Sequence, residues 1–447
     1  MTFIPNSEKK QQMLKTLKLK DIDELFSDIP KKIQITNLNL PTGISEQKVE
    51  HKLKDIAKQN TPFQQMPSFI GGGIKPHYIP AIVKSIILRP EFYTSYTPYQ
   101  SEASQGFLQA MFEYQSMIAE LTGMDIANAS LYDGMTALGE AALMSSRINK
   151  KNKFIIPENI SWEKKSILHN FVKGHDITIK EIPFEDASGK IALHALKEVL
   201  DESVSGVYIE NPNFFGVFED DVNAISKMTH ELGSLFIVGV DPLSLGIVKS
   251  PSEYNADIVI GESRVFGNPM DFGGSSLGLF ACKKEFLRQI PGRVIGLTKD
   301  CNDKQSYCMT LQTREQHIRR GRATSNICTN EGLCTLAATV YLSWLGGSGF
   351  QKLSQINYNQ GEKLGGKIAN INGFSLRFTS SNFNEFVVQC PKPGKIINEA
   401  LLKADIIGGL SLDKWFPKLK NCMLFGITEM HTEEDINKLV DGLKEVA

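Results

Sequence analysis

The chain has 447 residues, of which 41% are hydrophobic and 22% are charged, and its formal net charge is −1. This length exceeds what one small core needs and favours a large domain with a smaller one, in a composition ordinary for a soluble protein. The near-zero net charge gives no electrostatic basis for binding nucleic acid or an anionic membrane.

No stretch of the sequence combines the length and the apolarity of a membrane span. The best candidate, IPAIVKSIIL at 79–88, is short and is interrupted by Lys84. The first 26 residues mix both charge signs, contain no arginine and lack the apolar core of a secretion signal. The seven cysteines show no CxxC or metal-type spacing, which is typical of reduced thiols rather than of disulfides or zinc. We therefore expect a cytoplasmic protein without a metal site.

The pattern of elements along the chain predicts the fold class. Residues 1–65 are polar and helical in character, and we interpret them as an arm over the main body or over a partner. Apolar positions at helical spacing then predict a helix over 105–123 that ends at Gly123. From 153 to 262, apolar strands alternate with helices, which is typical of a parallel sheet buried on both faces. The predicted fold is therefore α/β, with a mostly parallel, doubly wound sheet. The predicted strands are 153–158, 176–184, 205–212, 234–242 and 256–262, and the predicted helices between them are 161–173, 194–203 and 220–232.

The C-terminal third of the sequence differs from the preceding part in its composition and in its pattern of predicted elements. Residues 287–330 form a polar, arginine-rich connection, and 331–346 form an apolar helix that ends in a glycine-rich break. Strands and helices alternate again from about residue 372. The predicted division is an N-terminal helical arm (1–65), a large domain (66–325), and a connecting helix with a small α/β domain (326–447).

Ligands of doubly wound sheets bind beyond the carboxyl ends of the strands, and polar segments of this chain fall there. Gly134 and Thr136 open an apolar helix whose first amides suit a phosphate, although Asp133 could simply cap that helix. Asp241 follows an apolar strand, where a carboxylate could hold a protonated pyridine nitrogen. An Asp-Pro turn is equally ordinary loop chemistry.

Two further segments extend this set. Arg322, Thr324, Ser325 and Asn326 form a group of donors that could reach a phosphate or could be a solvated connector. Residues 256–278, ADIVIGESRVFGNPMDFGGSSLG, predict a buried strand that enters a glycine-rich turn. Such a turn often carries a reactive side chain, but this one has no lysine, cysteine or histidine and offers only Arg264.

The order of these segments resembles the PLP-dependent, aminotransferase-like (fold type I) class, whose members are normally dimers with shared sites. More specifically, the tyrosine-rich block FYTSYTPYQSEASQGFLQAMFEYQSMIAELTGMDIANASLYDGMTA, at 92–137, resembles the signature of glycine decarboxylase, the P-protein of the glycine cleavage system. The segments PGRVIG, ATSNICT and NEGLCTLAATVYLSWLG also resemble that family. Many bacteria split this enzyme into homologous α and β chains, and the length and the N-terminal FIPNSEKKQQML resemble the α type.

The resemblance explains the missing nucleophile. Aligning Phe266, Pro269 and the Gly273–Gly274 pair with the catalytic β type places Arg264 where that chain has its cofactor-binding lysine. An imine requires an amine that can lose its proton, and arginine, with a pKa above about 12, keeps its proton in proteins. We therefore expect a vestigial cofactor site. One role for Arg264 would be an ion pair with Asp241 or Glu262 in the space of the cofactor.

The vestigial site would retain Asp133, Gly134, Thr136 and Asp241, and the chain would contribute other side chains to a lysine-bearing β subunit. The first candidates are Tyr96, Thr97, Tyr99, Gln100 and Ser104, and the second are Thr324, Ser325 and Asn326. Packing at a subunit interface is the alternative role for the first group, and a solvated connector is the alternative for the second.

The resemblance implies decarboxylation of glycine on PLP bound by the partner, with transfer of the aminomethyl group to the lipoyl arm of H-protein. It also implies a heterotetramer of two α and two β chains. Two rival hypotheses remain. The chain could be a self-sufficient PLP-dependent decarboxylase that uses Lys283 or Lys284, or a scaffold subunit that supplies no active-site group.

Overall fold

The computed structural model describes residues 7–35, 37–62, 65–95 and 97–447, and the chain divides into two units after Pro62. The first unit contains η1 (Ser7–Lys9), α1 (Lys10–Thr16), η2 (Asp23–Phe26) and α2 (Glu46–Ala57). Within α2 no side chain is buried, and Val49, Leu53 and Ile56 are exposed. The helical character expected of the N-terminal segment is therefore present.

The second unit is built on a seven-stranded sheet with the order β1-β7-β6-β5-β4-β2-β3. Strands β3, β2, β4, β5 and β6 are parallel, whereas β7 is antiparallel to β6 and β1 is antiparallel to β7. The predicted mostly parallel sheet is confirmed, with an antiparallel edge in addition. The strands are β1 (Ile126–Ala127), β2 (Lys153–Pro157), β3 (Thr178–Ile182), β4 (Val204–Glu210), β5 (Leu235–Val240), β6 (Ile258–Glu262) and β7 (Gly278–Cys282).

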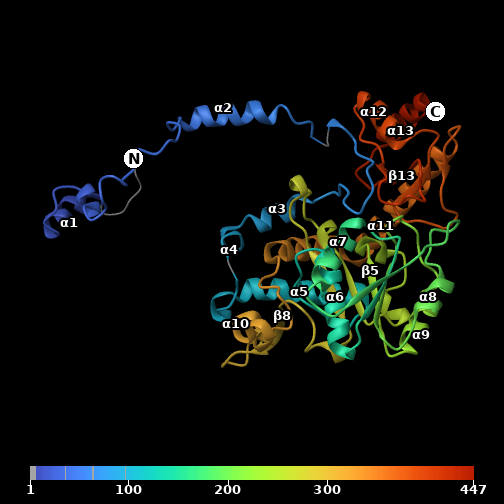
Figure 1. The fold of residues 1–447 in the computed structure, drawn as a ribbon, viewed down its shortest axis with the longest axis horizontal. Helices are drawn as coiled ribbons and strands as arrows, with labels where there is room; N and C mark the ends of the chain where they lie inside the picture. Colours follow the sequence, from blue (N-terminus) through green and yellow to red (C-terminus); the bar gives the residue numbers. More distant parts are fainter. Residues whose placement is uncertain (1–6, 36, 63–64, 96) are drawn as a thin grey trace. The chain divides into compact units, whose positions relative to one another are not determined.

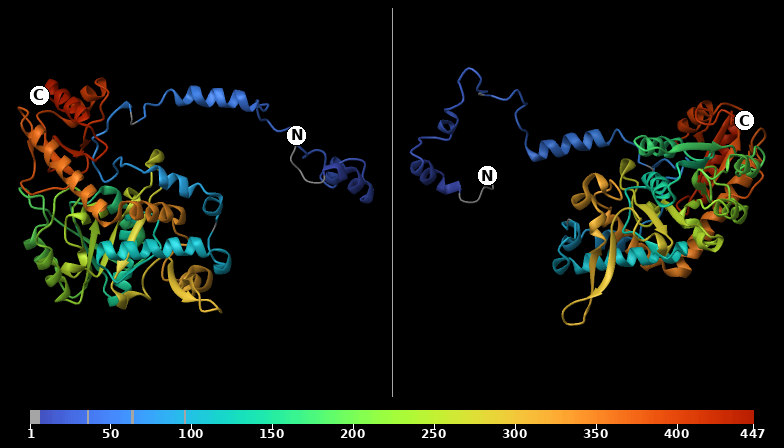
Figure 2. Two further views of the ribbon diagram at one scale, coloured as in Figure 1. Left: turned by 180° about the vertical axis from the view of Figure 1, so that it is seen from behind. Right: turned by 60° about the horizontal axis from the view of Figure 1, so that its bottom comes forward.

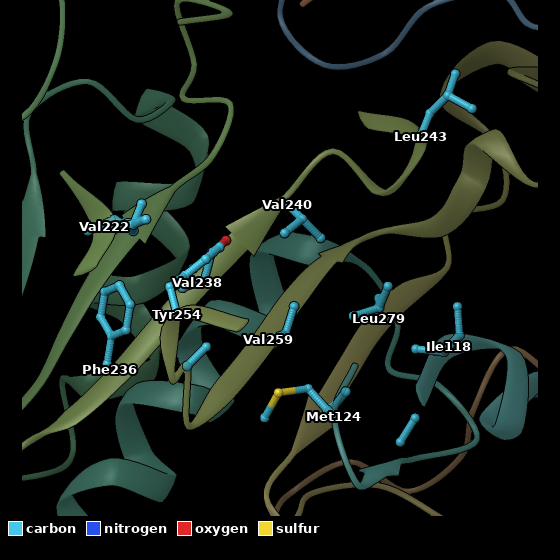
Figure 3. Packing of buried hydrophobic residues seen from close by; sticks show 14 of the residues in the cluster. Ile118, Met124, Val222, Phe236, Val238, Val240, Leu243, Tyr254, Val259 and Leu279 are labelled. Carbon is cyan, nitrogen blue, oxygen red and sulfur yellow. The ribbon is translucent and has the colours of Figure 1, made fainter. Parts of the chain in front are cut away.

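Helices cover both faces of this sheet because alternate strand residues point to opposite sides. Val238, Val259 and Leu279 belong to one apolar cluster, together with Ile118 of α5 (Figure 3). On the other face, Ile237 and Ile260 pack with residues of α6 and α7. The large domain is therefore a three-layer α/β/α structure. Its helices are α3 (Ala81–Ile87), α4 (Pro90–Tyr93), α5 (Gln105–Thr122), α6 (Gly134–Asn149), α7 (Trp162–Val172), α8 (Leu193–Val199) and α9 (Val222–His230). Helix α5 ends at Gly123, whose φ of 68° is left-handed, as the sequence predicted.

The connection after the sheet contains a hairpin that the sequence reading missed. Strands β8 (Val294–Lys299) and β9 (Gln305–Thr310) pair antiparallel, and Figure 2 shows this hairpin extending from the body of the second unit. Gln115 of α5 holds its base, because its side-chain amide donates to the carbonyl of Ile295 (3.0 Å) and accepts from the same residue's N–H (2.8 Å). The side chain of Gln115 thus takes the place of a neighbouring strand for the backbone of Ile295. The hairpin is therefore ordered although its sequence lacks the apolar pattern of a strand. The short α10 (Gln316–Arg319) follows.

Helix α11 (Gly332–Ala369) links the large domain to the small one. Gly346, with φ of 60°, interrupts its helical geometry at the predicted glycine-rich break, but the helix continues for another 23 residues, from 347 to 369. The length and the composition of α11 alone would allow it to cross a membrane. In this fold, however, it packs against α3 and α5, and its apolar side chains Leu336, Tyr341 and Leu364 are buried.

The small domain is a four-stranded antiparallel sheet of order β10-β11-β13-β12 with helices α12 and α13, which lie together in Figure 1. Its elements are β10 (Ser375–Leu376), β11 (Glu385–Gln389), α12 (Gly394–Lys403), β12 (Leu410–Ser411), β13 (Cys422–Gly426) and α13 (Glu433–Val446). Ser68 and Ile70 form bridges to Ile407 and Phe425. Residues 68–71, which the sequence alone placed with the large domain, therefore join the small-domain sheet.

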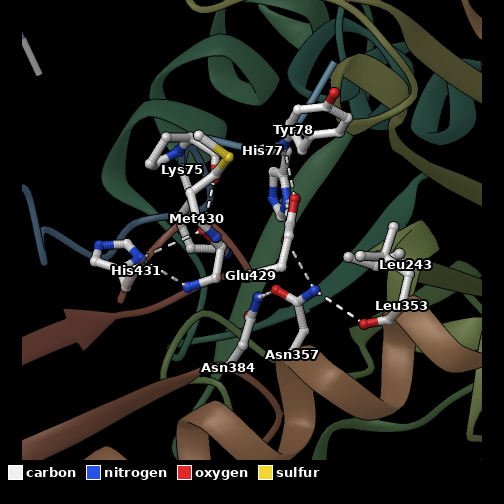
Figure 4. A network of polar contacts seen from close by, with 12 residues as sticks. Lys75, His77, Tyr78, Leu243, Leu353, Asn357, Asn384, Glu429, Met430 and His431 are labelled. Atoms are coloured by element: carbon white, nitrogen blue, oxygen red, sulfur yellow. Dashed lines mark hydrogen bonds and ion pairs between the residues drawn. The ribbon is translucent and has the colours of Figure 1, made fainter. Parts of the chain in front are cut away.

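A buried polar network centred on Glu429 holds this junction together (Figure 4). Its carboxylate accepts from His77 Nδ1 (3.1 Å), from the N–H of Tyr78 (2.8 Å) and from Asn357 Nδ2 of α11 (2.9 Å). Burial favours the neutral acid, but the positive charge of His77 and these hydrogen bonds outweigh it and hold the pKa of Glu429 at about 2. Asn384 in turn donates to Asn357 (3.2 Å). One carboxylate thus joins three segments that are distant in sequence.

Glu429 should make stability depend on pH at the acid end. Its folded pKa of about 2 lies below its ordinary value of 4.5, so its contribution is present above pH 4.5 and is lost as the pH falls towards 2. We expect Glu429→Gln to lower the free energy of unfolding at pH 7 by about 3 kcal/mol. Urea titrations at pH 7, 5.5, 4.5 and 4 should show this difference shrinking below pH 4.5. The exposed Glu445→Gln is the control, and a constant difference across the series would contradict the assignment.

Candidate functional site

A large cleft lies at the carboxyl ends of the central parallel strands. It has a volume of about 660 Å³ and is lined by Glu210 at the end of β4, Asp241 after β5 and Glu262 at the end of β6. The small domain closes it with Glu385 of β11. This is the position at which doubly wound sheets bind ligands, as the sequence predicted.

The start of α6 forms one wall of the cleft. The Asp133 carboxylate accepts from the N–H of Thr136 (2.7 Å), so Asp133 caps the helix. A second carboxylate is also present, because Oε2 of Glu262 accepts from the N–H of Gly134 (3.1 Å). A Cβ on Gly134 would lie 3.0 Å from the carbonyl oxygen of Gly261, so helix and strand approach closely here. Two of the first amides of α6, those of Gly134 and Thr136, are therefore already engaged by carboxylates of this chain.

Glu262 connects three parts of the cleft. Besides Gly134, its carboxylate accepts from the N–H of Arg264 (3.1 Å) and of Leu277 (2.8 Å). Burial raises the pKa of Glu262, and the three N–H donors oppose that shift. The sequence pattern contained no signal for this role beyond the position of Glu262 at the end of a strand.

Arg264 follows β6 in a single 3₁₀ turn, η7 (Ser263–Val265), and is 5% exposed. Its Nη2 donates to the carbonyl oxygens of Gly273 (3.1 Å) and Gly274 (2.9 Å) and to Ser276 Oγ (3.2 Å). The expected ion pair with Asp241 or Glu262 is wrong, since the guanidinium turns to the glycine turn and touches Glu262 only through its backbone N–H. The glycine turn supplies carbonyls at close range, and these attract the guanidinium away from the carboxylates.

A buried lysine that the sequence reading missed lies beside Asp241. Nζ of Lys75 is 3.9 Å from Asp241 Oδ2 and 3.3 Å from Glu385 Oε2, and the lysine side chain is 2% exposed. Glu385 also accepts from the N–H groups of Gly72 (2.7 Å) and Gly73 (2.9 Å). The only available signal was the run GGGIKPH, in which three glycines precede a lone cation.

The other cleft lysine and the lysines after β7 are paired as well. Nζ of Lys164 contacts Glu210 (2.5 Å), and Lys283 contacts Asp257 (2.5 Å). Because β7 is antiparallel to β6, its end at Cys282 pairs with Ile258, at the start of β6. Lys283 and Lys284 therefore lie at the sheet edge opposite the cleft.

These residues do not fit the PLP cofactor that the resemblance implies. PLP requires an amine for the imine, free N–H donors for its phosphate and a carboxylate for its pyridine nitrogen. Here Arg264 stands after the strand, Glu262 engages the first amide of α6, and Nζ of Lys75 lies 3.9 Å from Asp241 and 3.3 Å from Glu385.

The tyrosine-rich segment lies apart from the cleft lining. Tyr96 falls outside the described residues, and Gln100 is exposed. The Tyr99 hydroxyl and the Thr97 hydroxyl both accept from the guanidinium of Arg293, at 3.1 and 3.5 Å. Ser104 is half-buried at the start of α5, and its side chain makes no capping hydrogen bond.

The same arginine connects this segment with the second predicted group. Arg293 donates to the carbonyl of Cys328 (3.0 Å), two residues after Asn326. Ser325 donates its hydroxyl to Glu140 of α6 (2.8 Å), whereas Asn326 is exposed and Thr324 half-buried. The structure thus brings the two predicted groups into one region, although their individual roles stay predictions.

Comparison with known proteins shows what this chain is similar to. The family model described as "Glycine cleavage system P-protein" matches residues 1–443. A relative from Thermococcus onnurineus, named "Probable glycine dehydrogenase (decarboxylating) subunit 1", is 46% identical over 447 residues, covering 100% of this chain and 99% of the relative. A crystal structure of glycine decarboxylase (P-protein) of the glycine cleavage system, in inhibitor-bound form, superposes with a TM-score of 0.91 at 36% identity and covers 100% of both chains. Sphingosine-1-phosphate lyase from Burkholderia pseudomallei shares the fold, with a TM-score of 0.68 at 11% identity over 93% of each chain.

Removing the buried ammonium of Lys75 should destabilise the second unit. Lys75→Met would leave Asp241 and Glu385 without their shared cation, and breaking a buried pair costs about 3–5 kcal/mol. We expect a clearly lower urea midpoint for Lys75→Met. The double variant Lys75→Met/Glu385→Gln should recover part of the loss because one unpaired carboxylate is gone. Lys395→Met, which removes an exposed i,i+4 pair, is the control, and equal midpoints for the two single variants would refute this role.

Proposed function

The chain belongs to the glycine cleavage system P-protein family, and we propose that it is the subunit of glycine dehydrogenase (decarboxylating) that completes the active site of a lysine-bearing homologous partner. The observation that carries this proposal is the state of its own cleft. Arg264 cannot form an imine, the carboxylate of Glu262 already accepts from the first amide of α6, and the ammonium of Lys75 lies beside Asp241. A family member with such a cleft needs a second chain to hold PLP.

The proposed reaction is that of the glycine cleavage system. Glycine loses its carboxyl group as CO2, and the remaining aminomethyl group passes to a sulfur of the lipoyl arm of H-protein, whose disulfide is reduced. PLP bound by the partner subunit would supply the electron sink for the loss of CO2. The expected assembly is a cytoplasmic heterotetramer with two copies of each chain.

This chain would act through the surface around Arg293. Tyr99 is 47% exposed although its hydroxyl is hydrogen-bonded, and Gln100 beside it is exposed. A tyrosine presents an apolar ring together with a hydroxyl that can reach a carboxylate or a phosphate. Thr97, Ser104, Thr324, Ser325 and Asn326, with Tyr96, complete the proposed contribution.

A scaffold subunit without active-site groups is the second candidate. The hydroxyl of Ser325 already serves Glu140, and those of Thr97 and Tyr99 serve Arg293. Side chains with such internal partners could act in assembly alone. A self-sufficient decarboxylase is less consistent with the site, because Lys75 and Lys164 are paired within the cleft and Lys283 lies at the opposite sheet edge.

Activity should require both chains. We expect the isolated chain to give no exchange of labelled bicarbonate into glycine, whereas the chain mixed with its lysine-bearing homologue and lipoylated H-protein should be active. In that mixture Tyr99→Phe and Gln100→Ala should each lower turnover about tenfold while the complex still assembles in gel filtration. Unchanged turnover would favour the scaffold. Release of CO2 by the isolated chain would end the proposal.

Restoring the lysine alone should not restore cofactor binding. In Arg264→Lys, Glu262 still engages the first amide of α6 and Lys75 still neutralises Asp241. We therefore expect no borohydride-trapped PLP adduct at residue 264, measured by mass spectrometry after incubation with excess PLP. The lysine-bearing partner, treated in parallel, is the positive control. A stoichiometric adduct at position 264 of the Arg264→Lys variant would show that the cleft still fits PLP.

A further inference from the structure

Arg293 is a buried cation with no acidic partner. It is 3% exposed, and within the described ranges no carboxylate forms an ion pair with it. A buried charge without a counter-ion is costly unless its donors are satisfied. Neutral acceptors offset part of this cost, because Nη1 and Nη2 each donate to two of them, whereas Nε has no hydrogen-bond partner in the described structure.

The acceptors of Arg293 come from two segments that are distant in sequence. Nη2 donates to the Tyr99 hydroxyl (3.1 Å) and to the carbonyl of Cys328 (3.0 Å), and Nη1 donates to Asn330 Oδ1 (3.2 Å) and to Thr97 Oγ1 (3.5 Å). The guanidinium carbon also lies 5.3 Å from the centroid of the Tyr99 ring, within cation–π range. The planar guanidinium of Arg293 therefore holds both the hydroxyl and the ring of Tyr99 in place.

The backbone of Arg293 is itself held firmly. Its carbonyl accepts from the N–H of Ala129 (2.8 Å). Two residues further on, the backbone of Ile295 makes two hydrogen bonds with the side chain of Gln115 in α5. Residues 328–330 are anchored independently, because Cys328 N–H donates to the Tyr132 hydroxyl (3.1 Å). Arg293 thus projects from a rigid base, whereas Tyr99 lies in a loop between α4 and η4 (Ser101–Ala103).

We propose that Arg293 is the positioning residue of the surface that this chain presents to its partner, acting through Tyr99. This inference rests on the proposed function. Lysine would keep the charge but has neither the planar fork nor the stacking face. It could not hold the Tyr99 hydroxyl, the Cys328 carbonyl and the Asn330 side chain together.

A double-mutant cycle in the reconstituted enzyme tests this role. Arg293→Lys and Tyr99→Phe should each lower kcat about tenfold, with a smaller change in KM for glycine, and the double variant should be no worse than about tenfold because both changes act on one interaction. Arg288→Lys, an exposed arginine on the same connection, is the control and should keep wild-type turnover. If the double variant lost about a hundredfold in kcat, the two changes would act independently and the proposal would be overturned. A loss of kcat in Arg293→Lys with none in Tyr99→Phe would overturn it as well.

A second measurement separates this inference from the proposed function. In the isolated chain, Arg293→Lys should speed amide hydrogen exchange in 97–104 and 326–331 several-fold and leave β5 unchanged. Unaltered exchange in both segments would overturn the positioning role. Suppose that Arg293→Lys speeds exchange in these segments, but that the wild-type chain mixed with its lysine-bearing homologue is inactive. The proposed function then fails, and the positioning role of Arg293 stands.

Discussion

The carboxylate of Glu262 is the contact on which the arrangement of the cleft depends. Three backbone N–H groups, from Gly134, Arg264 and Leu277, converge on it at 2.8–3.1 Å. They belong to the start of α6, the turn after β6 and the residue before β7, so one side chain fixes the spacing of three elements. Because carboxylate hydrogen bonds to N–H groups are stronger than neutral ones, this contact also occupies the place where a helix N-terminus would accept an external anion.

The remaining charges of the cleft follow from that constraint. The carboxylate of Glu262 binds backbone amides, and the guanidinium of Arg264 donates instead to the carbonyls of the glycine turn. The ammonium of Lys75 lies near the carboxylates of Asp241 and Glu385. Buried charges are tolerated when internal partners replace water. Within the cleft, the ionised side chains are therefore balanced by one another and by backbone groups of this chain.

The sequence predicted the elements that rest on local patterns. The apolar strands, the helix ending at Gly123, the cap at Asp133 and the position of Asp241 after a strand all depend on spacing and turn chemistry. Lys75, Glu385 and Arg293 could not be found in this way, because their partners lie up to 313 residues away, as 385 − 72 gives for the Gly72–Glu385 hydrogen bond. The β8–β9 hairpin was missed for a related reason. Gln115 completes its hydrogen bonding, and no periodic pattern records a contribution from another helix.

The two buried arginines, Arg264 and Arg293, are stabilised in the same way but in different parts of the chain. Both lack a carboxylate partner in the described structure, and both use carbonyl and hydroxyl oxygens instead. Arg264 does so inside the cleft, where its guanidinium donates to the carbonyls of Gly273 and Gly274. Arg293 does so beneath an exposed tyrosine, and its hydrogen bonds hold that side chain in place without covering it. The same residue type therefore has a different structural effect in each place: Arg264 binds the glycine turn within the cleft, whereas Arg293 orders an exposed polar surface.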